Sequence, residues 1–542
     1  MNQHTAPEAV VSQASGQAEA GASPPCVVSR RRVITRMGGA ALVLALALGL
    51  VGCGDATSRR ADHDEVLPPN REQSDALFDY AIGLLDDLDQ YNDFNNSQAR
   101  KQIVGRLNQW LQLDEVAGDW RPDPLLSTLP EGFQRLPIVR RLGDLHFAPP
   151  DGTLLREAIW LRDVARTARG QAVDEVDKAR ALFDWTVRNI QLDAAAPVES
   201  RPVFLPWQTL LFGHGLPEDR AWVFVLLARQ QGLDVVMLAL PDKASPKGYR
   251  PWIPALLSHG ELYLFDPELG LPLPTSTGDG VGTLSEIATD DGLLRRLDLD
   301  EHPYPIRAGD LSGVIALVEA SPAYLSRRME LIESRLAGEH ALVLSVDASG
   351  LAEKLRASPH VSDVRLWLLP YERIAEQVNP TREQTQAIIR EAIPFQVGDA
   401  TLWKARVLHL MGHLTGKASA NTLYLASRPA EADIARAKLD PAKKEILKLR
   451  KQDASYWLGL VAFERGKYET AIGHFEKRTL ADWPHGRWTA GARFNLARAF
   501  EATGRLDRAA ELYAADTSPQ WHGNHLRARW LERSKREGSQ PR

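Results

Sequence analysis

Apolar residues between 74 and 150 recur at intervals of three and four, which is the spacing of amphipathic helices. One apolar stripe falls within 77–88 and a second within 103–111. Four prolines then interrupt the pattern, and proline lacks the N–H that a helix interior needs; they are Pro122, Pro124, Pro130 and Pro137. The pattern predicts a helical N-terminal region over 74–150 with irregular connections.

A different pattern runs through 151–275, where predicted helices precede predicted strands. The periodicity indicates helices over 154–167 and 174–190. The stretch 217–231 is apolar almost all round, which is typical of a helix in the middle of a core. After Gly232, short apolar runs predict three strands, at 235–240, 252–257 and 261–265. We therefore expect an α+β core in this region.

The remaining 267 residues divide into two predicted parts. Residues 276–400 begin with a Gly-, Thr- and Asp-rich stretch typical of a linker. A small α/β element follows it, with the order strand, helix, strand at 341–346, 351–355 and 364–369. From Glu383 the pattern is helical, and 401–530 is interpreted as an all-α region.

The N-terminus has the pattern of a secretory signal. Four arginines at 30–32 and 36 precede an apolar run over 40–51. This run is shorter than the ~20 residues of a membrane-spanning helix and fits the apolar core of a signal peptide. It ends in Leu50-Val51-Gly52-Cys53, which resembles a bacterial lipobox. The resemblance implies a signal peptide over 1–52, a lipid on Cys53 and a tether over 53–73. The protein would then be anchored in the cell envelope, on the extracytoplasmic, periplasmic side of a membrane.

Cleavage before Cys53 changes what the composition implies. The chain has 542 residues, with 65 basic and 70 acidic side chains and two cysteines. Removing residues 1–52, with four arginines and two glutamates, leaves 490 residues and a formal charge of −7. Cys26 is lost and Cys53 is acylated, so no thiol remains for catalysis, a disulfide or a cysteine-based zinc site. The charge balance argues against a nucleic-acid-binding protein, which usually carries a basic excess.

The stretch 174–270 resembles the bacterial transglutaminase-like domain, which has a papain-like fold. Residues 178–190 are similar to the leading helix of that family. The helix that carries the family's nucleophile has matching positions in Gly215, Ala221, Arg229 and Gly232. Asp266-Pro267, with Gly270 behind it, resembles the third catalytic position.

The resemblance also implies that this core has lost its chemistry. The family uses a thiolate at a helix N-terminus, an imidazole and an orienting carboxylate. Here the cysteine position is Pro217 and the histidine position is Arg250, so Asp266 alone remains. Proline suits the first turn of a helix, and Glu218 and Asp219 complement its positive end. We expect a non-catalytic domain in which Arg250 forms a salt bridge with Asp266.

An enzyme remains the alternative: a divergent peptidase, amidase or acyl-transfer enzyme with an unidentified nucleophile. His214 and His259 lie near the expected pocket, although His259 falls in a predicted turn. The chain has no Gly-x-Ser-x-Gly elbow, His-Glu-x-x-His motif or phosphate-binding loop. His409 and His413 are spaced to share a helix face, but no third ligand is evident. We expect neither a metal nor a cofactor.

Residues 454–515 contain an internal repeat with an offset of 38. Leu458-Gly459, Gly466, Tyr468, Ala471 and Phe475 recur as Leu496-Ala497, Gly504, Leu506, Ala509 and Tyr513. The pattern resembles the tetratricopeptide repeat, and 400–428 is interpreted as a degenerate earlier unit. A plain bundle of helical hairpins is the alternative.

Such repeats form a concave surface for a peptide or protein. We expect Tyr468, Phe475 and Tyr513 to contribute to it. The sequence thus predicts a membrane-anchored, non-catalytic binding or scaffold module of the cell envelope, whose repeats dock a protein partner. A third hypothesis is that the core is only a spacer that holds the repeats off the membrane.

Overall fold

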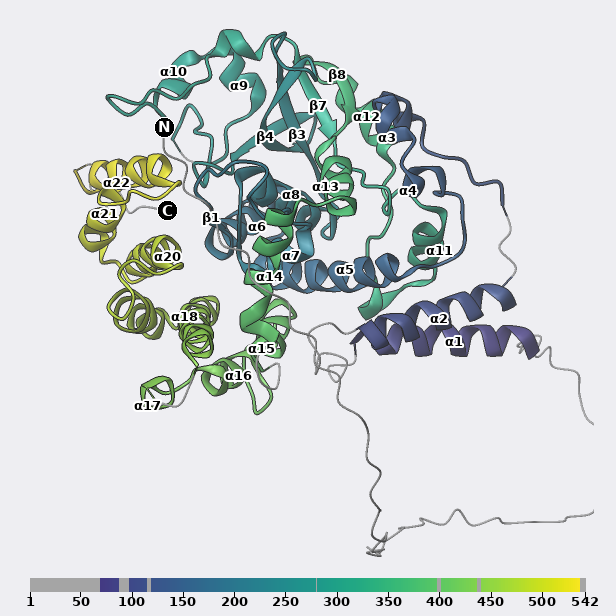
Figure 1. The fold of residues 1–542 in the computed structure, drawn as a ribbon. Helices are drawn as coiled ribbons and strands as arrows, with labels where there is room; N and C mark the ends of the chain where they lie inside the picture. The colour runs from purple at the N-terminus through teal and green to yellow at the C-terminus, as the bar shows by residue number, and fades with distance from the viewer. Residues whose placement is uncertain are drawn as a thin grey trace, which may run out of the picture. The chain divides into compact units, whose positions relative to one another are not determined.

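The computed structural model describes residues 69–86, 97–114, 118–278, 280–396, 401–435 and 440–536, which belong to one compact unit. They form an α+β fold in which helices surround a six-stranded sheet (Figure 1). The expected signal peptide, Cys53 and most of the expected tether lie outside these ranges. In the ranges described, no helix combines the length and apolar composition needed to cross a membrane.

The predicted N-terminal helices are present. α1 (Pro69–Asp86) begins five residues before the predicted start and packs along α2 (Ser97–Leu113). Phe78 and Trp110 join the two helices, with ring centroids 4.9 Å apart. The proline-rich connection forms three short helices, η2 (Pro124–Thr128), α3 (Glu131–Gln134) and α4 (Pro137–Arg140).

Four further helices follow before the sheet begins, namely α5 (Pro149–Ala168), α6 (Glu175–Asn189), α7 (Pro206–Phe212) and α8 (Pro217–Arg229). Asp174 caps the N-terminus of α6, because its carboxylate accepts the backbone N–H groups of Val176 and Asp177. α8 is buried from Asp219 to Ala228, as its all-round apolar sequence predicted. Two short parallel strands, β1 (Gln191–Leu192) and β2 (His214–Gly215), lie between these helices.

The three predicted strands form the middle of the sheet. β3 (Asp234–Pro241), β4 (Tyr249–Ser258), β5 (Glu261–Asp266) and β6 (Leu271–Pro272) pair antiparallel in that order. On β3, Val235 and Met237 face the core that contains α8, while Val236 and Leu238 face a second core. This second core holds α9 (Leu284–Thr289) and α10 (Asp291–Arg295). A strand buried on both faces explains the continuous apolar run.

The sheet continues across the predicted boundary at residue 275. β7 (Val314–Val318) pairs antiparallel with β3, and β8 (Val361–Leu366) pairs parallel with β7. The α/β element was therefore predicted with the right order but the wrong first strand. Four helices lie between the two strands or just before them: η3 (Ala308–Leu311), α11 (Arg327–Arg335), η4 (Gly338–His340) and α12 (Ala348–Arg356).

The predicted strand at 341–346 is wrong, and the reason lies in its hydrogen bonds. Gln230 bonds both the carbonyl and the N–H of Val343, at 2.8 and 3.2 Å. The Glu333 carboxylate accepts from the N–H groups of Leu344 and Ser345, at 2.9 and 2.6 Å. Because side chains satisfy this backbone, the segment needs no neighbouring strand.

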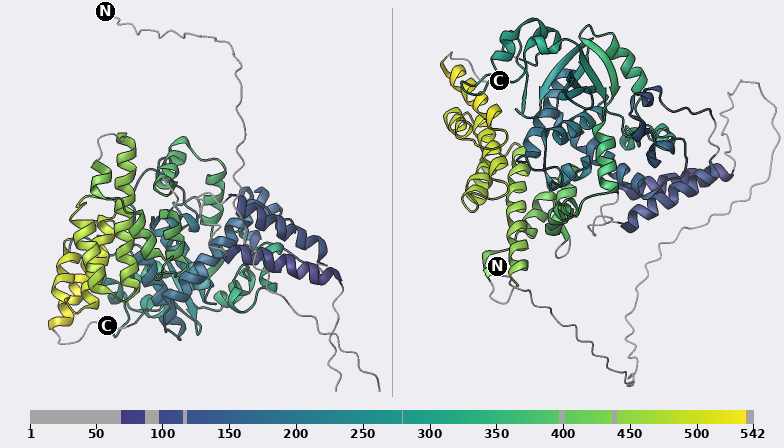
Figure 2. Two further views of the ribbon diagram at one scale, coloured as in Figure 1. Left: turned by 90° about the horizontal axis from the view of Figure 1, so that it is seen from below. Right: turned by 45° about the horizontal axis from the view of Figure 1, so that its top comes forward.

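The remaining described residues are mainly helical, as predicted from Glu383 onward, whereas the helix at Leu369–Val378 was not predicted. α13 (Leu369–Val378) and α14 (Arg382–Gln396) are followed by α15 (Thr401–Leu410), α16 (Ala420–Ser427), α17 (Glu431–Ala435) and α18 (Pro441–Glu464). Then come α19 (Tyr468–Ile472), its π-helical continuation η5 (Gly473–Leu480), α20 (Thr489–Ala502), α21 (Leu506–Ala514) and α22 (Trp521–Arg536). Figure 2 shows the helices from α18 onward stacked side by side at one edge of the fold.

Candidate functional site

The N-terminus of α8, where the resemblance places a nucleophile, is a helix start without reactive groups. Pro217 occupies the first helical position, where its missing N–H has no partner to lose. The Asp219 carboxylate accepts the N–H of Leu216 at 2.9 Å and so caps the helix. Both placements agree with the sequence prediction.

Asp266 is held by neutral groups and not by Arg250. One carboxylate oxygen accepts the Tyr304 hydroxyl at 2.8 Å, and the other accepts the N–H groups of Glu268 and Leu269, each at 2.9 Å. The Trp252 indole donates in turn to the Tyr304 hydroxyl at 3.0 Å. Burial raises the pKa of Asp266 above its usual range, although these hydrogen bonds act to lower it.

The predicted Arg250–Asp266 salt bridge is wrong because the strand register separates the two side chains. Arg250 is exposed and pairs with Leu240 near the start of β4. Ala255 pairs with Leu264, and the same register extended by two residues sets Asp266 opposite Ile253. A tyrosine from a loop therefore takes the role that the sequence gave to Arg250.

Arg220, one turn into α8, fills the space between these elements. Its guanidinium donates to the carbonyl of Ile190, at 3.1 and 2.5 Å, and to the carbonyl of Pro267 at 2.7 Å. It also donates to the side chain of Gln520, the residue before α22, at 2.9 Å. Burial lowers the pKa of Arg220 to about 9. The region is thus occupied by a structural cation rather than open to a substrate.

The histidine candidate His214 lies in a charged cluster. Gly213 ends α7 in the left-handed region, at φ 73°, and the parallel pairing of β1 with β2 brings Asp193 beside the ring. His214 Nδ1 lies 2.9 Å from both Asp193 oxygens, and Nε2 lies 3.2 Å from Glu391 of α14. Arg487, just before α20, binds the same Glu391 carboxylate at 2.5 Å.

These contacts fix the charge of the cluster. Burial alone would lower the pKa of His214, but the Asp193 and Glu391 carboxylates raise it to about 9. Burial likewise opposes ionisation of Glu391, yet hydrogen bonds and charges from His214 and Arg487 lower its pKa to about 2. At neutral pH the imidazole is therefore a cation with both N–H groups donated. It has no lone pair with which to act as a general base.

A pocket of about 290 Å³ opens beside this cluster. Its charged lining consists of Asp193, Arg201, His214, Asp219, Arg390 and Glu391. Its apolar lining consists of Ala194, Ala196, Pro202, Phe204, Leu216 and Ala387. Burial raises the pKa of Asp219 to about 6, although Arg373 lies 3.3 Å away. The volume is at the lower end of the range for small-molecule sites.

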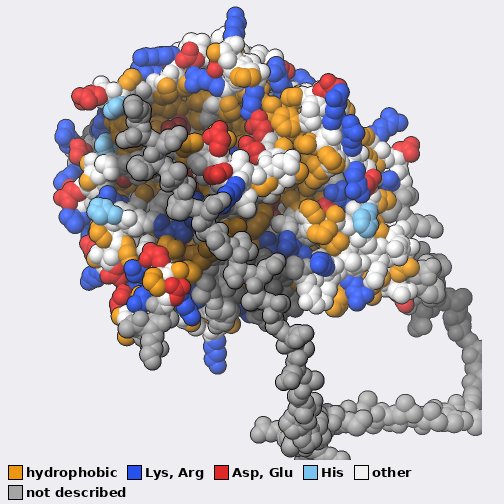
Figure 3. Space-filling view, in the orientation of Figure 1, with side chains coloured by type: hydrophobic (Ala, Val, Ile, Leu, Met, Phe, Trp, Pro, Cys, Tyr) orange, Lys and Arg blue, Asp and Glu red, His pale blue; other side chains and the backbone are white. Residues whose placement is uncertain are grey.

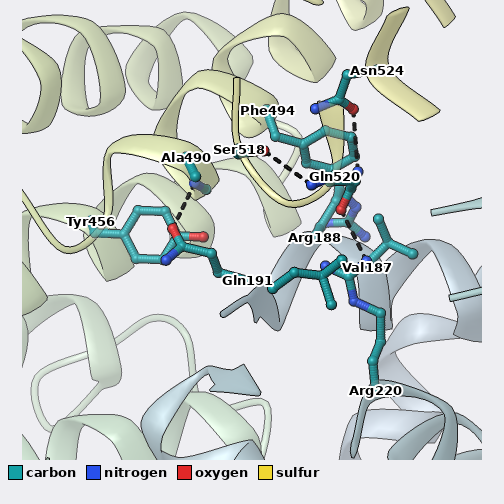
Figure 4. Close-up of a pocket in the computed structure, with 12 residues that line it drawn as sticks. Val187, Arg188, Gln191, Arg220, Tyr456, Ala490, Phe494, Ser518, Gln520 and Asn524 are labelled. Atoms are coloured by element: carbon teal, nitrogen blue, oxygen red, sulfur yellow. Dashed lines mark hydrogen bonds between the residues drawn. The ribbon is translucent and has the colours of Figure 1, made fainter. Parts of the chain in front are cut away.

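A second, smaller cavity marks the junction between the core and the C-terminal helices (Figure 4). It measures about 20 Å³, room for about one water molecule. Gln191 crosses this junction, accepting the N–H of Gly491 at 2.7 Å and donating to the carbonyl of Arg487 at 2.9 Å. Figure 4 also shows Gln520 between Arg220 and Asn524. We interpret this cavity as structural.

The C-terminal helices α18 and α20 contact helix α6 of the core through hydrogen bonds. Asn495 of α20 donates to the carbonyl of Arg188 at 3.0 Å. Glu464 of α18 accepts from Trp185 and Asn189 of α6, at 3.0 and 3.1 Å. The core therefore covers the part of α18 and α20 that contacts α6.

The three residues predicted to bind a partner have different environments. Phe475 and Tyr513 are 0% and 1% exposed, and Phe475 packs under Gly459 where the two helices meet. Their rings fill the space between helices and offer a partner no surface. Tyr468 is half-buried beside Phe463, with ring centroids 5.1 Å apart.

The other histidines have structural or solvent-facing positions. His259 is exposed in the β4–β5 turn, as predicted. His409 is buried and lies 3.1 Å from Glu464, whereas His413 is exposed beyond the end of α15. The predicted shared helix face is therefore wrong, because the helix ends at Leu410. Within the part of the chain that the structure describes, no three potential ligands cluster as a metal site would require.

Sequence reasoning missed the residues that define the charged cluster and the Asp266 contacts. Asp193, Tyr304, Glu391 and Arg487 come from four separate segments. Asp193 and His214 meet through a pairing of two-residue strands, which is too short to leave a periodic signal. Only the position of His214 before α8 pointed toward this site.

The described surface shows no large area of one charge sign on the face in Figure 3, where Lys and Arg alternate with Asp and Glu around the edge. This mixture agrees with the nearly equal numbers of basic and acidic residues in the sequence.

Comparisons of the chain with protein-family models, curated proteins and solved structures found no match.

Proposed function

We propose that the protein is a non-catalytic binding or scaffold module with a degenerate transglutaminase-like core. One observation carries the proposal: Pro217 stands at the first position of α8, and the Asp266 carboxylate accepts hydrogen bonds from the Tyr304 hydroxyl and two backbone N–H groups. A thiol-based acyl transfer at this corner would need a nucleophile and an imidazole, and neither Pro217 nor Arg250 supplies one.

The protonation state of His214 supports the same proposal. The Asp193–His214 contact has the form of a base with its orienting carboxylate, which favours the alternative of an enzyme. The Glu391 carboxylate contacts the second ring nitrogen, Nε2, however, and the imidazole stays protonated at neutral pH. A general base must be free to accept a proton near the working pH.

The C-terminal hairpins, with their repeat-like helix pairing, fit a scaffold role. Helices α18, α20 and α22 form hydrogen bonds with the core, and α19 and α21 pack against these helices. We propose that a protein partner docks on the accessible part of these hairpins, with Tyr468 at its edge. The lipobox-like Cys53 would hold the module on the extracytoplasmic side of a membrane.

Activity probes test the proposal that no acyl-transfer or hydrolytic chemistry remains. The purified chain is incubated with a biotinylated primary amine plus an acyl donor, and separately with a fluorophosphonate. We expect no labelling above that of heat-denatured protein. H214Q and D266N are the matched variants: labelling of the parent that disappears in either variant would establish an enzyme and overturn the proposal.

The lipid anchor requires its own experiment, because Cys53 lies outside the described residues. Cells expressing the chain are grown with an alkyne-tagged fatty acid. We expect the tag on the parent protein and its complete loss in C53S, with C26S unchanged because Cys26 would be removed with the signal peptide. Tagging of C53S equal to the parent would rule out Cys53 as the anchor.

A further inference from the structure

We propose that the pocket beside His214 binds a carboxylate with a short apolar body, seated against Arg201 and Arg390. This inference rests on the proposed binding function and names its ligand class. Both arginines line the 290 Å³ pocket, Arg201 from the loop before α7 and Arg390 from α14. The argument depends on which charges around the pocket already have partners.

The three carboxylates of the pocket are committed to other cations. Asp193 binds His214 at 2.9 Å, and Glu391 binds Arg487 at 2.5 Å. Asp219 lies 3.3 Å from Arg373 and also caps α8. Each of the three carboxylates therefore already has a cationic partner within the protein.

The two arginines are less fully paired. Arg201 reaches Glu218 only at 3.8 Å, and its buried Nε has no hydrogen-bond partner within the described ranges. Arg390 is exposed and contacts no carboxylate in the part of the chain that the structure describes. Guanidinium groups with free N–H donors are suited to bidentate recognition of an anion.

The surroundings favour a carboxylate over a phosphate. A phosphate group would bring about two negative charges close to Asp193, Asp219 and Glu391, whereas a carboxylate brings one. The remaining walls consist of small apolar groups from Ala194, Ala196, Pro202 and Ala387, with the Phe204 ring. Such walls suit methyl-sized substituents. The C-terminus of a short peptide and a free aliphatic acid both have this chemistry.

Titration calorimetry on the full chain tests the inference with N-acetyl-alanyl-alanine, its C-terminal amide, butyrate and inorganic phosphate as probes. We expect the dipeptide acid to bind and its amide to bind at least about tenfold more weakly. Butyrate distinguishes the sources: affinity equal to that of the dipeptide indicates a free acid, and weaker binding indicates a peptide C-terminus. Phosphate binding as tight as that of the acid would overturn the assignment of a carboxylate.

The variants R201Q and R390Q should each weaken binding of the acid by about tenfold or more, since each removes a charge-assisted hydrogen bond. R382Q is the matched control, because Arg382 is an exposed arginine on the same helix that does not line the pocket. Equal affinity in R390Q and R382Q, or no binding by the parent, would overturn the inference. Binding followed by chemical conversion of the probe would uphold the carboxylate site and overturn the non-catalytic function.

Discussion

Two carboxylates share the His214 imidazole, and this sharing makes the stability of the protein depend on pH. The pKa of His214 is about 9 in the folded protein, against 6.5 for an unperturbed imidazole. The stabilisation is complete below pH 6.5 and is lost as pH rises through 9, because the folded state binds the proton more tightly. H214Q should therefore lower the free energy of unfolding by about 3 kcal/mol at pH 6 and by much less at pH 10.

Urea unfolding of the parent and H214Q at the two pH values measures this difference. Burial raises the pKa of Glu157 to about 8, so that group adds its own pH dependence, but equally in both proteins. H259Q is the control, since His259 is exposed in a turn. A loss of stability in H214Q that is the same at pH 6 and pH 10 would contradict the proposed charge state of His214.

Single residues at the corner of α8 were easier to predict than their partners. Pro217 and Asp219 act within one turn of helix, so their roles follow from local sequence. The partner of Asp266 depends on strand register and on a loop more than 30 residues away, and it proved to be Tyr304. Because burying an unpaired charge costs free energy, the sequence predicted that Asp266 has a partner, but it did not predict which residue that partner is.

At the scale of elements, close helix pairing rests on Gly459 in α18. A Cβ at this position would overlap the Phe475 ring of η5. G459A should therefore destabilise the protein by about 1–3 kcal/mol through overpacking, and F475L in the same chain should restore part of the loss. G83A is the matched control, because a Cβ there has nothing within 4 Å and alanine favours the helix. Thermal unfolding measures all three; an unchanged midpoint for G459A would mean that the helices are not packed this closely.

Element types were predictable where apolar residues had an unambiguous period, as in α5 and α6, or where an apolar run was long, as in α8. The apolar runs at 314–318 and 341–346 are alike in length and composition, and only the first became a strand. Tertiary contacts distinguish the two runs. The run at 314–318 pairs with β3 and forms β7, whereas the side chains of Gln230 and Glu333 form hydrogen bonds with the backbone of the run at 341–346. Short apolar segments do not encode that choice locally.

For the whole molecule, the contacts between α22 and the turn after β5 hold the C-terminal helices on the core. Gly523 packs on the backbone of Leu269 so closely that a Cβ would overlap the carbonyl oxygen. Backbone cannot yield as a flexible side chain can, so G523A must separate the surfaces that hold Gln520 against Arg220. We expect the parent to unfold in a single calorimetric transition, and G523A to unfold at lower temperature in two transitions. G473A, where a Cβ meets nothing within 4 Å, should leave the transition single. One unshifted transition in G523A would show that the C-terminal helices are not docked on the core in this way.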